Sequence, residues 1–416
     1  MAEPIETAFY GILDRAKKDG CLALDGMVRT MEPIFRAAGF RQADMPGIKH
    51  ILVLRLDEIG DSVLTSGFLR ELRASEPRAY ITLVVNPVVY PLVELCPYVN
   101  EVLVYKGSHK GSFAERFEWA LELCREHLWA RHFALCLCPR WDFDRYFALL
   151  LGYMSGSAER VGYSEKLYEG KARANAGFDL LLTRPVMNPP QIVHEVERNF
   201  FLLQAAGYPV RDKRLELWYD AADVQRAAVL CKRFSKKRQL VSVALGANEA
   251  NKAYPAEKFL TALRILAEQG LAFALLGGPG DRAAGNQIAA GLDAGVAVNF
   301  AGETSLRESA AIMARTMLYI GSDTGLKHVA AALSLPVLEI NREAKDCQKT
   351  IISLWTRFFP WQTPTISLQP EHALGECARV LSQGGCVARE PHCIAQIGPE
   401  EIVAGYEALT RMTFLR

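Results

Sequence analysis

An aspartate occupies a turn where glycines would be expected to bind phosphate. The stretch "IKHILVLRLDEIGDSVLTSGFLREL" (48–72) contains an apolar run at 51–54, then a turn and a helical pattern, the layout of a βα unit. A phosphate-binding turn needs several glycines and exposed backbone N–H groups, but this turn offers only Gly60 beside Asp57 and Asp61. Asp61 suits an N-cap of the following helix or a proton-accepting role, and Asp57 suits a surface or capping role.

A second turn has the features of an anion site. In "MLYIGSDTGLKHVAAALSLPVLEI" (317–340), an apolar strand ends before Asp323 and a helix should start near Thr324. The N–H groups of Thr324, Gly325 and Leu326 would lack helical partners at the positive end of the helix dipole. Gly325 permits close approach of an anion, and His328 follows one turn later. The alternative is a plain N-cap by Asp323 or Thr324.

Two further strand-to-loop turns carry polar residues or glycines. In "VALGANEANKAYPAEKF" (243–259), Asn248 and Lys252 precede Pro255, which should open a helix. A lysine in this place can neutralise a diphosphate as a point charge; alternatively, Lys252 is a solvated surface residue. "LLGGPGDR" (275–282) is rich in glycine but matches neither the dinucleotide nor the Walker pattern. A turn of this kind suits a purine or ribose packed against it.

The segments that carry these turns alternate between strand and helix. Apolar runs near 51–55, 79–86, 101–105 and 133–139 alternate with helical patterns near 62–74, 113–126 and 145–156, and a similar series restarts at 240. This alternation predicts an α/β protein with two Rossmann-like, doubly wound parallel sheets. Ligands of such sheets bind beyond the carboxyl ends of the strands, so we expect these edges to face a central cleft.

Composition is that of a globular protein with more than one core. The chain has 416 residues, 50% of them hydrophobic and 23% charged, with a formal net charge of +1. We expect a helical N-terminal extension (1–46), an N-terminal domain (47–222) and a C-terminal domain with a cysteine-containing end (223–416). The balanced charge argues against a nucleic-acid partner. Neither a signal peptide nor an apolar membrane span is evident, which favours a cytoplasmic location.

The chain resembles glycosyltransferase family 9, the ADP-heptose:lipopolysaccharide heptosyltransferases with the two-lobed GT-B fold. The resemblance runs from 48 to about 405 and is strongest in "IGDSV" and "GSDTGLKHVAAAL". The other matching stretches, in the family's order, are "ERVGY", "HEVERNFFLLQAAG", "NKAYPAEKF", "LLGGPGDR", "NFAGETSLRESAAIMART" and "IGPEEI".

This resemblance implies roles for individual residues. It assigns the general base to Asp61, which would take the proton of the acceptor hydroxyl as that oxygen attacks the anomeric carbon. Lys252, with Asn248 beside it, would bind the phosphates of the donor, and Thr304 would lie near the nucleoside. The residues implied to hold the diphosphate and sugar are Asp323, Thr324, Gly325, Leu326 and His328.

The implied reaction is an inverting transfer that needs no metal, from ADP-heptose to an inner-core sugar of lipopolysaccharide. It would take place at the cytoplasmic face of the inner membrane, with at most peripheral membrane contact. A protein hydroxyl, as in autotransporter glycosylation, and a non-catalytic nucleotide-sugar-binding protein are the alternatives. Arginines such as Arg55 and Arg140 suit anionic acceptor groups or surface salt bridges. The sequence "NREAKDCQKTIISLWTRFFPWQTP" after "PVLEI" departs from the family, so the sugar is less well specified than the nucleotide.

Three late cysteines stand in polar, loop-like sequence. Cys377, Cys386 and Cys393 have Cys347 and His392 nearby. They suit free thiols, a disulfide or a metal site, as a cysteine-bound iron occurs in the related autotransporter-protein heptosyltransferases. The spacing C-x8-C-x6-C lacks a C-x2-C pair, which makes these cysteines weak candidates for metal ligands.

Overall fold

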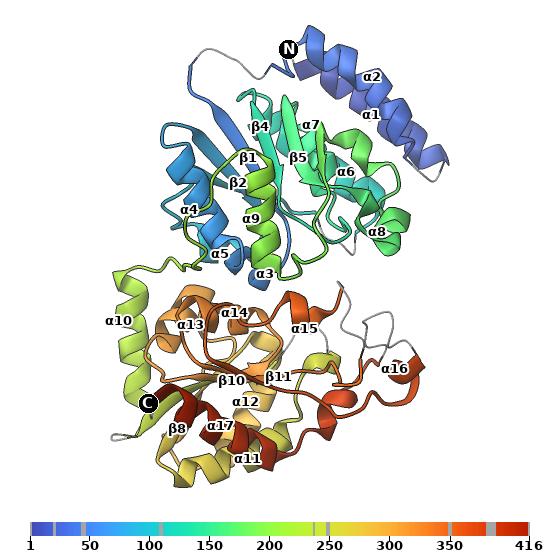
Figure 1. Ribbon diagram of the computed structural model, residues 1–416. Coiled ribbons are helices and arrows are strands. Elements are labelled where there is room, and N and C mark those ends of the chain that lie inside the picture. The colour runs from blue at the N-terminus through green and yellow to red at the C-terminus, as the bar shows by residue number, and fades with distance from the viewer. Residues whose placement is uncertain are drawn as a thin grey trace. The chain divides into compact units, whose positions relative to one another are not determined.

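The chain forms two compact units, each built on a six-stranded sheet (Figure 1). The computed structural model describes residues 2–19, 22–42, 47–107, 111–235, 238–246, 250–347, 352–379 and 388–414. The units are Met1–Lys213 and Arg214–Arg416. Both sheets are parallel, which confirms the predicted α/β class with two doubly wound domains. Among the described helices, none has both the length and the apolar character needed to cross a membrane.

The first sheet has the strand order β3-β2-β1-β4-β5-β6. Its strands are β1 (His50–Arg55), β2 (Tyr80–Val85), β3 (Glu101–Val104), β4 (Leu135–Cys138), β5 (Glu159–Tyr163) and β6 (Arg184–Val186). The order reverses at β1, because β1 pairs with β2 on one side and β4 on the other. Beyond the carboxyl ends of β1 and β4 lies the switch point, where open α/β sheets bind ligands.

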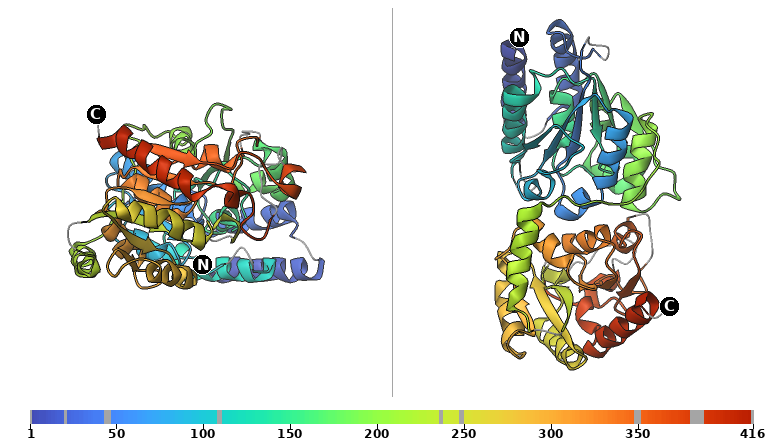
Figure 2. Two further views of the ribbon diagram at one scale, coloured as in Figure 1. Left: turned by 90° about the horizontal axis from the view of Figure 1, so that it is seen from below. Right: turned by 90° about the vertical axis from the view of Figure 1, so that its left-hand side faces the viewer.

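Helices cover both faces of this first sheet. They are α1 (Ala2–Asp19), α2 (Leu24–Ala37), α3 (Ile59–Val63), α4 (Ser66–Ser75), α5 (Tyr90–Val93), α6 (Phe113–Leu123), α7 (Ala148–Met154), α8 (Glu169–Ala174) and α9 (Glu195–Ala205). Helix α4 packs against α9, whereas α6 packs against α1 and α7. The right-hand view of Figure 2 shows these two groups on opposite sides of the strands.

The N-terminal helices α1 and α2 belong to the core of the first unit. Phe9 of α1 is fully buried, and its ring centroid lies 5.9 Å from that of Phe35 in α2. The same ring lies 6.0 Å from Phe117 in α6 and stacks on Trp129 at 6.4 Å. The described part of the N-terminal segment therefore packs on the body of its own chain, one of the two arrangements that its helical patterns allow.

The helix expected at 62–74 is two helices. α3 ends at Val63 and α4 begins at Ser66. Between them, Thr65 Oγ1 donates a hydrogen bond to the Asp61 carbonyl (2.8 Å) and Ser66 Oγ donates one to the Val63 carbonyl (2.7 Å). Hydroxyl groups that bond to nearby carbonyls compete with the helical ladder. Asp61 consequently lies in a separate, single-turn helix that follows β1.

The second sheet has the order β12-β11-β10-β7-β8-β9. Its strands are β7 (Gln239–Ala244), β8 (Leu271–Leu276), β9 (Ala297–Asn299), β10 (Tyr319–Ser322), β11 (Val337–Ile340) and β12 (Thr365–Leu368). The switch point lies between β7 and β10, which are paired in parallel. The turns that contain Lys252 and Asp323 follow these two strands, so the topology brings them to the same edge.

The helices of the second unit also form two groups. They are α10 (Ala221–Leu230), α11 (Ala256–Glu268), α12 (Arg282–Ala290), α13 (Leu306–Met313), α14 (Gly325–Ala332), α15 (Leu354–Arg357), α16 (Gly375–Arg379) and α17 (Pro399–Phe414). Figure 1 shows α13 and α14 on one side of the strands and α11, α12 and α17 on the other. Helix α10 packs against α13, where Arg307 Nε donates to Asp223 Oδ2 (2.9 Å). The units divide between Lys213 and Arg214, nine residues before the 222/223 boundary expected from the sequence.

The first unit contains a buried lysine in α8. Lys171 of α8 is 1% exposed, and its Nζ donates hydrogen bonds to the carbonyl oxygens of Trp141 (2.8 Å) and Tyr163 (3.1 Å). Burial, followed by the positive charge of Arg140, lowers the pKa of Lys171 from 10.5 to about 7. This lysine therefore loses its proton in the folded chain at a pH where an unfolded lysine keeps it.

Replacing Lys171 with methionine should remove a pH dependence of stability. Between pH 7 and 9 the unfolded chain holds the lysine proton and the folded chain releases it, so wild-type stability rises with pH through this titration. We expect the free energy of unfolding of wild type minus that of Lys171→Met to increase by about 1 kcal/mol per pH unit, measured by urea denaturation at pH 7, 8 and 9. The exposed Lys18→Met serves as a control. A difference that stays constant with pH would contradict the assigned pKa.

Candidate functional site

The predicted anion site lies where β10 ends and α14 begins. Thr324 occupies the N-cap position with extended backbone (φ −136°, ψ 170°), and its side chain makes no capping hydrogen bond. Thr324 is thus the N-cap by position, as one of the two alternatives has it, but it does not cap the helix with its side chain. Asp323, Gly325 and Leu326 are half-buried. Backbone N–H groups of the first helical turn thus lie at an accessible, positive helix end, which favours an anion.

A buried lysine that sequence reasoning missed organises this turn. Lys327 is fully buried, and its Nζ lies 2.6 Å from Asp323 Oδ1 and 2.6 Å from Glu339 Oε1. Glu339, fully buried on β11, also accepts hydrogen bonds from Asn341 Nδ2 (3.1 Å) and Ser367 Oγ (2.7 Å). The sequence contained one signal for this pair, because Asp323 stands four residues before Lys327. Glu339 has no such signal, since it comes from β11.

Charge pairing fixes the ionisation of this cluster. Burial opposes ionisation of Asp323, but the positive charges of Lys327 and Lys252 outweigh it and hold the pKa of Asp323 well below its ordinary value. Burial also opposes the charge of Lys327, yet Asp323 and Glu339 raise its pKa above the ordinary 10.5. Two lysines and two acids give a formal charge of zero, so attraction of an anion depends on the backbone amides and on the reach of Lys252.

Lys252 joins the same turn from the loop after β7. It ends the 3-10 turn η5 (Ala250–Lys252), and its Nζ lies 3.6 Å from Asp323 Oδ2 with the side chain 18% exposed. The alternative of a solvated surface lysine is therefore wrong. The preceding Asn251 is 7% exposed, bonds to Arg342 Nη1 and donates a hydrogen bond to the Ala388 carbonyl (2.6 Å). Three distant segments thus meet at this loop.

The remaining predicted residues of the second unit are placed differently. His328 is 3% exposed, and its ring lies 6.1 Å from that of Phe358. Electrostatic interaction with His328 is among the causes that lower the pKa of Asp323, so His328 belongs to the same cluster. Thr304 lies in the loop between β9 and α13, and β9 is three strands from β10 in the sheet. Asn248 lies outside the described residues.

The glycine-rich loop after β8 is closed by an aspartate. Gly278 donates its backbone hydrogen bond to Asp281 Oδ2 (2.8 Å). A Cβ on Gly277 would lie 2.4 Å from that carboxylate, and a Cβ on Gly246 would lie 1.7 Å from it. Gly302 donates to the Gly277 carbonyl (3.0 Å), which links the loop before α13 to this turn. Internal packing around Asp281 therefore accounts for glycines at 246 and 277 without a ligand.

In the first unit, Asp61 lies on α3 beyond the carboxyl end of β1. The N-cap of α3 is Glu58 and Asp61 is inside the helix, so the alternative of an N-cap role is wrong. Arg55 Nη2 donates a hydrogen bond to Asp61 Oδ1 at 3.0 Å. The side chain of Asp61 is 18% exposed. One side of this carboxylate is held by a buried cation and the side chain still reaches solvent.

Arg55 is the centre of a buried charge network. It is 1% exposed and lies between Asp61, Asp57 (Nη1 to Oδ2, 3.2 Å) and Glu195 (Nη2 to Oε1, 3.7 Å). Asp57 is 2% exposed and also pairs with Arg140. The predictions of a surface or capping role for Asp57 and a surface salt bridge for Arg55 are wrong. Sequence pattern does not reveal this network, because Glu195 joins it from α9, far along the chain.

A cavity of about 520 Å³ lies at the opposite edge of the first sheet. It is lined by the start of β1, including Lys49 and His50, together with Glu76, His132 and Tyr208. Arg55, at the other end of β1, leads into the turn that holds Asp61. The cavity is thus remote from the carboxyl edge where parallel sheets bind ligands, and we assign it no chemistry.

Two of the late cysteines come together. The ligand atoms of Cys377, His392 and Cys393 all lie within 4.8 Å of one another. His392 was a neighbour in the sequence, and the structure makes it a member of the group. Cys386 lies outside the described residues. Burial raises the pKa of the Cys347 thiol, and Cys377 adds a smaller contribution.

Removing the charge of Lys327 should destabilise the second unit. Lys327→Met would remove the ammonium group that lies between the carboxylates of Asp323 and Glu339. We therefore expect the free energy of unfolding to fall by about 3–5 kcal/mol. Lys345→Met is the matched control, because that lysine pairs with Glu371 at the surface (2.7 Å) and should change little. Urea denaturation measures both. A Lys327→Met loss no larger than that of the control would show that the buried pairs contribute nothing.

Comparison with known proteins shows which family this chain resembles. Residues 151–347 match the model of "Glycosyltransferase family 9 (heptosyltransferase)". Lipopolysaccharide heptosyltransferase 2 of Escherichia coli K12 is 26% identical over 301 residues, which are 70% of this chain and 82% of that protein.

Solved structures have the same fold. A family 9 glycosyltransferase from Veillonella parvula superposes with a TM-score of 0.67 at 20% identity, covering 89% of this chain and all of that one. The E. coli ADP-heptose lipopolysaccharide heptosyltransferase II gives a TM-score of 0.62 at 20% identity over 87% of this chain and 99% of that chain. The two parallel-sheet units are thus those of the GT-B fold, and the chain is similar to glycosyltransferase family 9, whose model it matches over residues 151–347.

Proposed function

We propose that this glycosyltransferase moves a heptosyl residue from ADP-heptose to a hydroxyl group of a lipopolysaccharide inner-core acceptor. The observation that carries the proposal is the accessible start of α14 with Lys252 beside it, on an edge where the fold binds ligands. The family description and the name of the E. coli relative support a heptose donor and a lipopolysaccharide acceptor. We place the reaction at the cytoplasmic face of the membrane that carries this acceptor.

The donor diphosphate would bind to the first turn of α14. The N–H groups of Thr324, Gly325 and Leu326 can donate to phosphate oxygens, and the helix dipole adds to the attraction. Lys252 is already 3.6 Å from Asp323 Oδ2, a distance that leaves its ammonium able to donate to a phosphate as well. Lys327 acts indirectly, because it holds Asp323 beside Lys252 and keeps both acids of the turn neutralised.

The sugar and nucleoside would lie on either side of the diphosphate. His328 and Phe358, whose rings are 6.1 Å apart, suit the sugar, since aromatic and imidazole rings combine an apolar face with a polar edge. Thr304, in the loop joined to the glycine turn after β8, suits the nucleoside. Asn248 remains a candidate phosphate ligand from the sequence alone.

Asp61 would act as the general base. The acceptor oxygen attacks the anomeric carbon, its proton passes to the Asp61 carboxylate, and the bond to the diphosphate breaks so that ADP leaves with the electron pair. A single displacement of this kind inverts the anomeric centre. Arg55 holds Oδ1 of Asp61 at 3.0 Å, which fixes the direction of the carboxylate. The amides of α14 and Lys252 stabilise the charge that develops on the leaving diphosphate, so the proposal requires no catalytic metal.

A protein hydroxyl is the closest alternative acceptor. The donor and base would be the same, and only the acceptor differs, so an assay that offers both acceptors separates the two. A non-catalytic binding protein is disfavoured, because the chain matches the model of a glycosyltransferase family over residues 151–347 and has an oriented, partly exposed Asp61.

Replacing Asp61 with asparagine should abolish turnover without abolishing donor binding. We expect kcat to fall by about 10²–10⁴-fold, because asparagine cannot take the proton, while the affinity for ADP stays within about twofold of wild type. The assay follows ADP release with ADP-heptose and a lipopolysaccharide core acceptor, and calorimetry follows ADP binding.

Glu101→Gln is the matched control for this substitution. Glu101 is a partly exposed acid paired with Arg131 at 2.8 Å in the same unit, and its variant should keep full activity. An Asp61→Asn enzyme with more than about a tenth of the wild-type kcat would rule out Asp61 as the base.

A further inference from the structure

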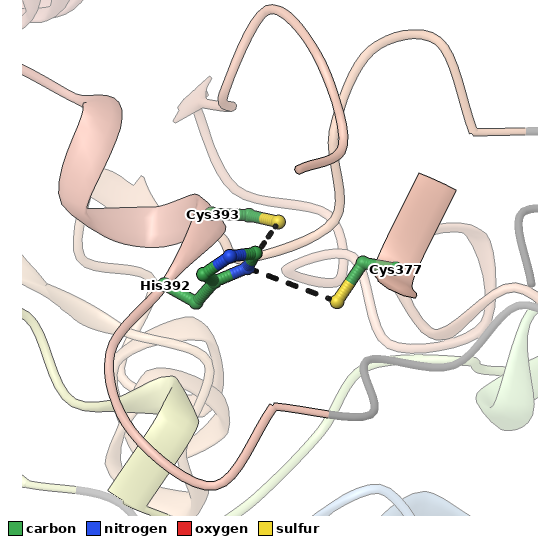
Figure 3. A group of neighbouring side chains, drawn as sticks. All are labelled: Cys377, His392 and Cys393. Carbon is green, nitrogen blue, oxygen red and sulfur yellow. Dashed lines mark hydrogen bonds between the residues drawn. The ribbon is translucent and has the colours of Figure 1, made fainter. Parts of the chain in front are cut away.

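A group of soft metal-ligand atoms lies near the C-terminus, on segments to which the proposed reaction assigns nothing. Cys377 is in the short helix α16, and Cys393 opens the 3-10 turn η8 (Cys393–Gln396), with His392 directly before it. Figure 3 shows both sulfur atoms directed towards the imidazole ring of His392. Two thiols and an imidazole from two separate segments thus converge on one point.

The distances between these atoms fit a shared ion. His392 Nδ1 lies 3.4 Å from Cys393 Sγ and 3.9 Å from Cys377 Sγ, and all three ligand atoms are within 4.8 Å of one another. Tetrahedral zinc with Zn–S of about 2.3 Å and Zn–N of about 2.05 Å requires S···N separations of about 3.6 Å. The observed values lie on either side of this number. A single ring nitrogen can accept a hydrogen from only one thiol at a time, whereas one central ion would bind all three atoms.

The surroundings suit charged thiolates. Cys377 and Cys393 are 5% and 4% exposed, and His392 is half-buried. The backbone N–H of Leu374 donates to Cys393 Sγ at 3.4 Å, a contact of the kind that supports a metal-bound sulfur. Two buried thiolates would repel each other strongly unless a cation lay between them. Sulfur and imidazole ligands select zinc or a similarly soft divalent ion over magnesium or calcium.

The chain around this group contacts the loop that carries Lys252. The Ala388 carbonyl accepts a hydrogen bond from Asn251 Nδ2 (2.6 Å), next to Lys252 in the sequence. In α11, Lys258 Nζ donates to the Ala395 carbonyl (2.6 Å). These hydrogen bonds connect residues 388–397 to Asn251 and Lys258, which lie on either side of Pro255 in the chain. A more rigid 388–397 segment therefore also holds the turn after β7 in place.

We propose that Cys377, His392 and Cys393 bind one divalent transition-metal ion of the zinc type, with a structural role. The ion joins α16 to η8 and so stiffens the segment that contacts Asn251 and α11. This proposal concerns the stability and metal content of the chain and does not depend on the proposed reaction.

Metal analysis of the full-length protein tests the proposal. The chain is purified without a metal-affinity tag from zinc-supplemented culture, and metals are measured by inductively coupled plasma mass spectrometry. We expect about one zinc or iron ion per chain in wild type and less than about 0.2 in Cys377→Ser and His392→Ala. Cys231→Ser is the matched control, since Cys231 is a half-buried thiol elsewhere in the same unit, and it should keep the full metal content.

A second measurement covers variants that fail to fold. Removal of the metal from wild type with a strong chelator should lower Tm, and adding Zn²⁺ should restore it. Wild type with less than about 0.1 metal ion per chain after zinc supplementation would overturn the proposal. An intact mass about 2 Da below that of the reduced chain, with Cys377 and Cys393 linked in the peptide map, would overturn it in favour of a disulfide. Full metal content in both ligand variants would overturn the choice of ligands.

Discussion

A buried cation held between carboxylates is the interaction on which both candidate sites depend. In the second unit Lys327, with no exposed surface, is bound by Asp323 and Glu339 at 2.6 Å each. In the first unit Arg55, 1% exposed, bonds to Asp61 within a set of three acids. A charge in such a position is tolerated only with its partners, so each cation fixes the acids around it.

The two cations have different consequences for chemistry. Lys327 neutralises the acids at the start of α14 and so removes a repulsion that would otherwise oppose an anion at that helix end. Arg55 orients the carboxylate of Asp61, whose side chain is 18% exposed, which supports the proposed role of Asp61 as general base. Arg55 is the last residue of β1, and Lys327 of α14 bonds to Asp323 directly after β10, so both cations are close to a switch point, where sheets of this kind bind ligands. The fold therefore determines where a ligand can bind, and the buried cations determine how the charges are arranged there.

Sequence pattern was sufficient for the fold and for several members of the site. Buried parallel strands read as apolar runs, so the alternation of strand and helix was visible, and the turns with Lys252 and Asp323 follow adjacent strands of one sheet. The pattern failed where contacts are distant in sequence. Glu195 reaches Arg55 from α9 and Glu339 reaches Lys327 from β11, and neither has a local signature.

Local competition and distant packing explain the other differences. The break between α3 and α4 results from hydroxyl groups bonding to nearby carbonyls, a choice that periodicity does not reveal. His392 adjoins Cys393 in the sequence, but only folding brings Cys377 to the same point. Glycines at 246 and 277, typical of ligand loops, are explained by the approach of Asp281. Residue types therefore indicated where chemistry was possible, and tertiary contacts decided which residues take part.

Calorimetric titration of nucleotides tests whether the turns after β7 and β10 bind the donor. ADP, UDP, GDP and CDP are titrated into wild type, Lys252→Ala and Lys345→Ala, the last as an exposed-lysine control paired with Glu371. The account predicts selective binding of ADP, weakened about tenfold by Lys252→Ala through loss of a charge-assisted hydrogen bond, with Lys345→Ala unchanged. Absence of binding by any nucleotide, or equal ADP affinity in wild type and Lys252→Ala, would contradict the assignment of the donor site to the turns after β7 and β10.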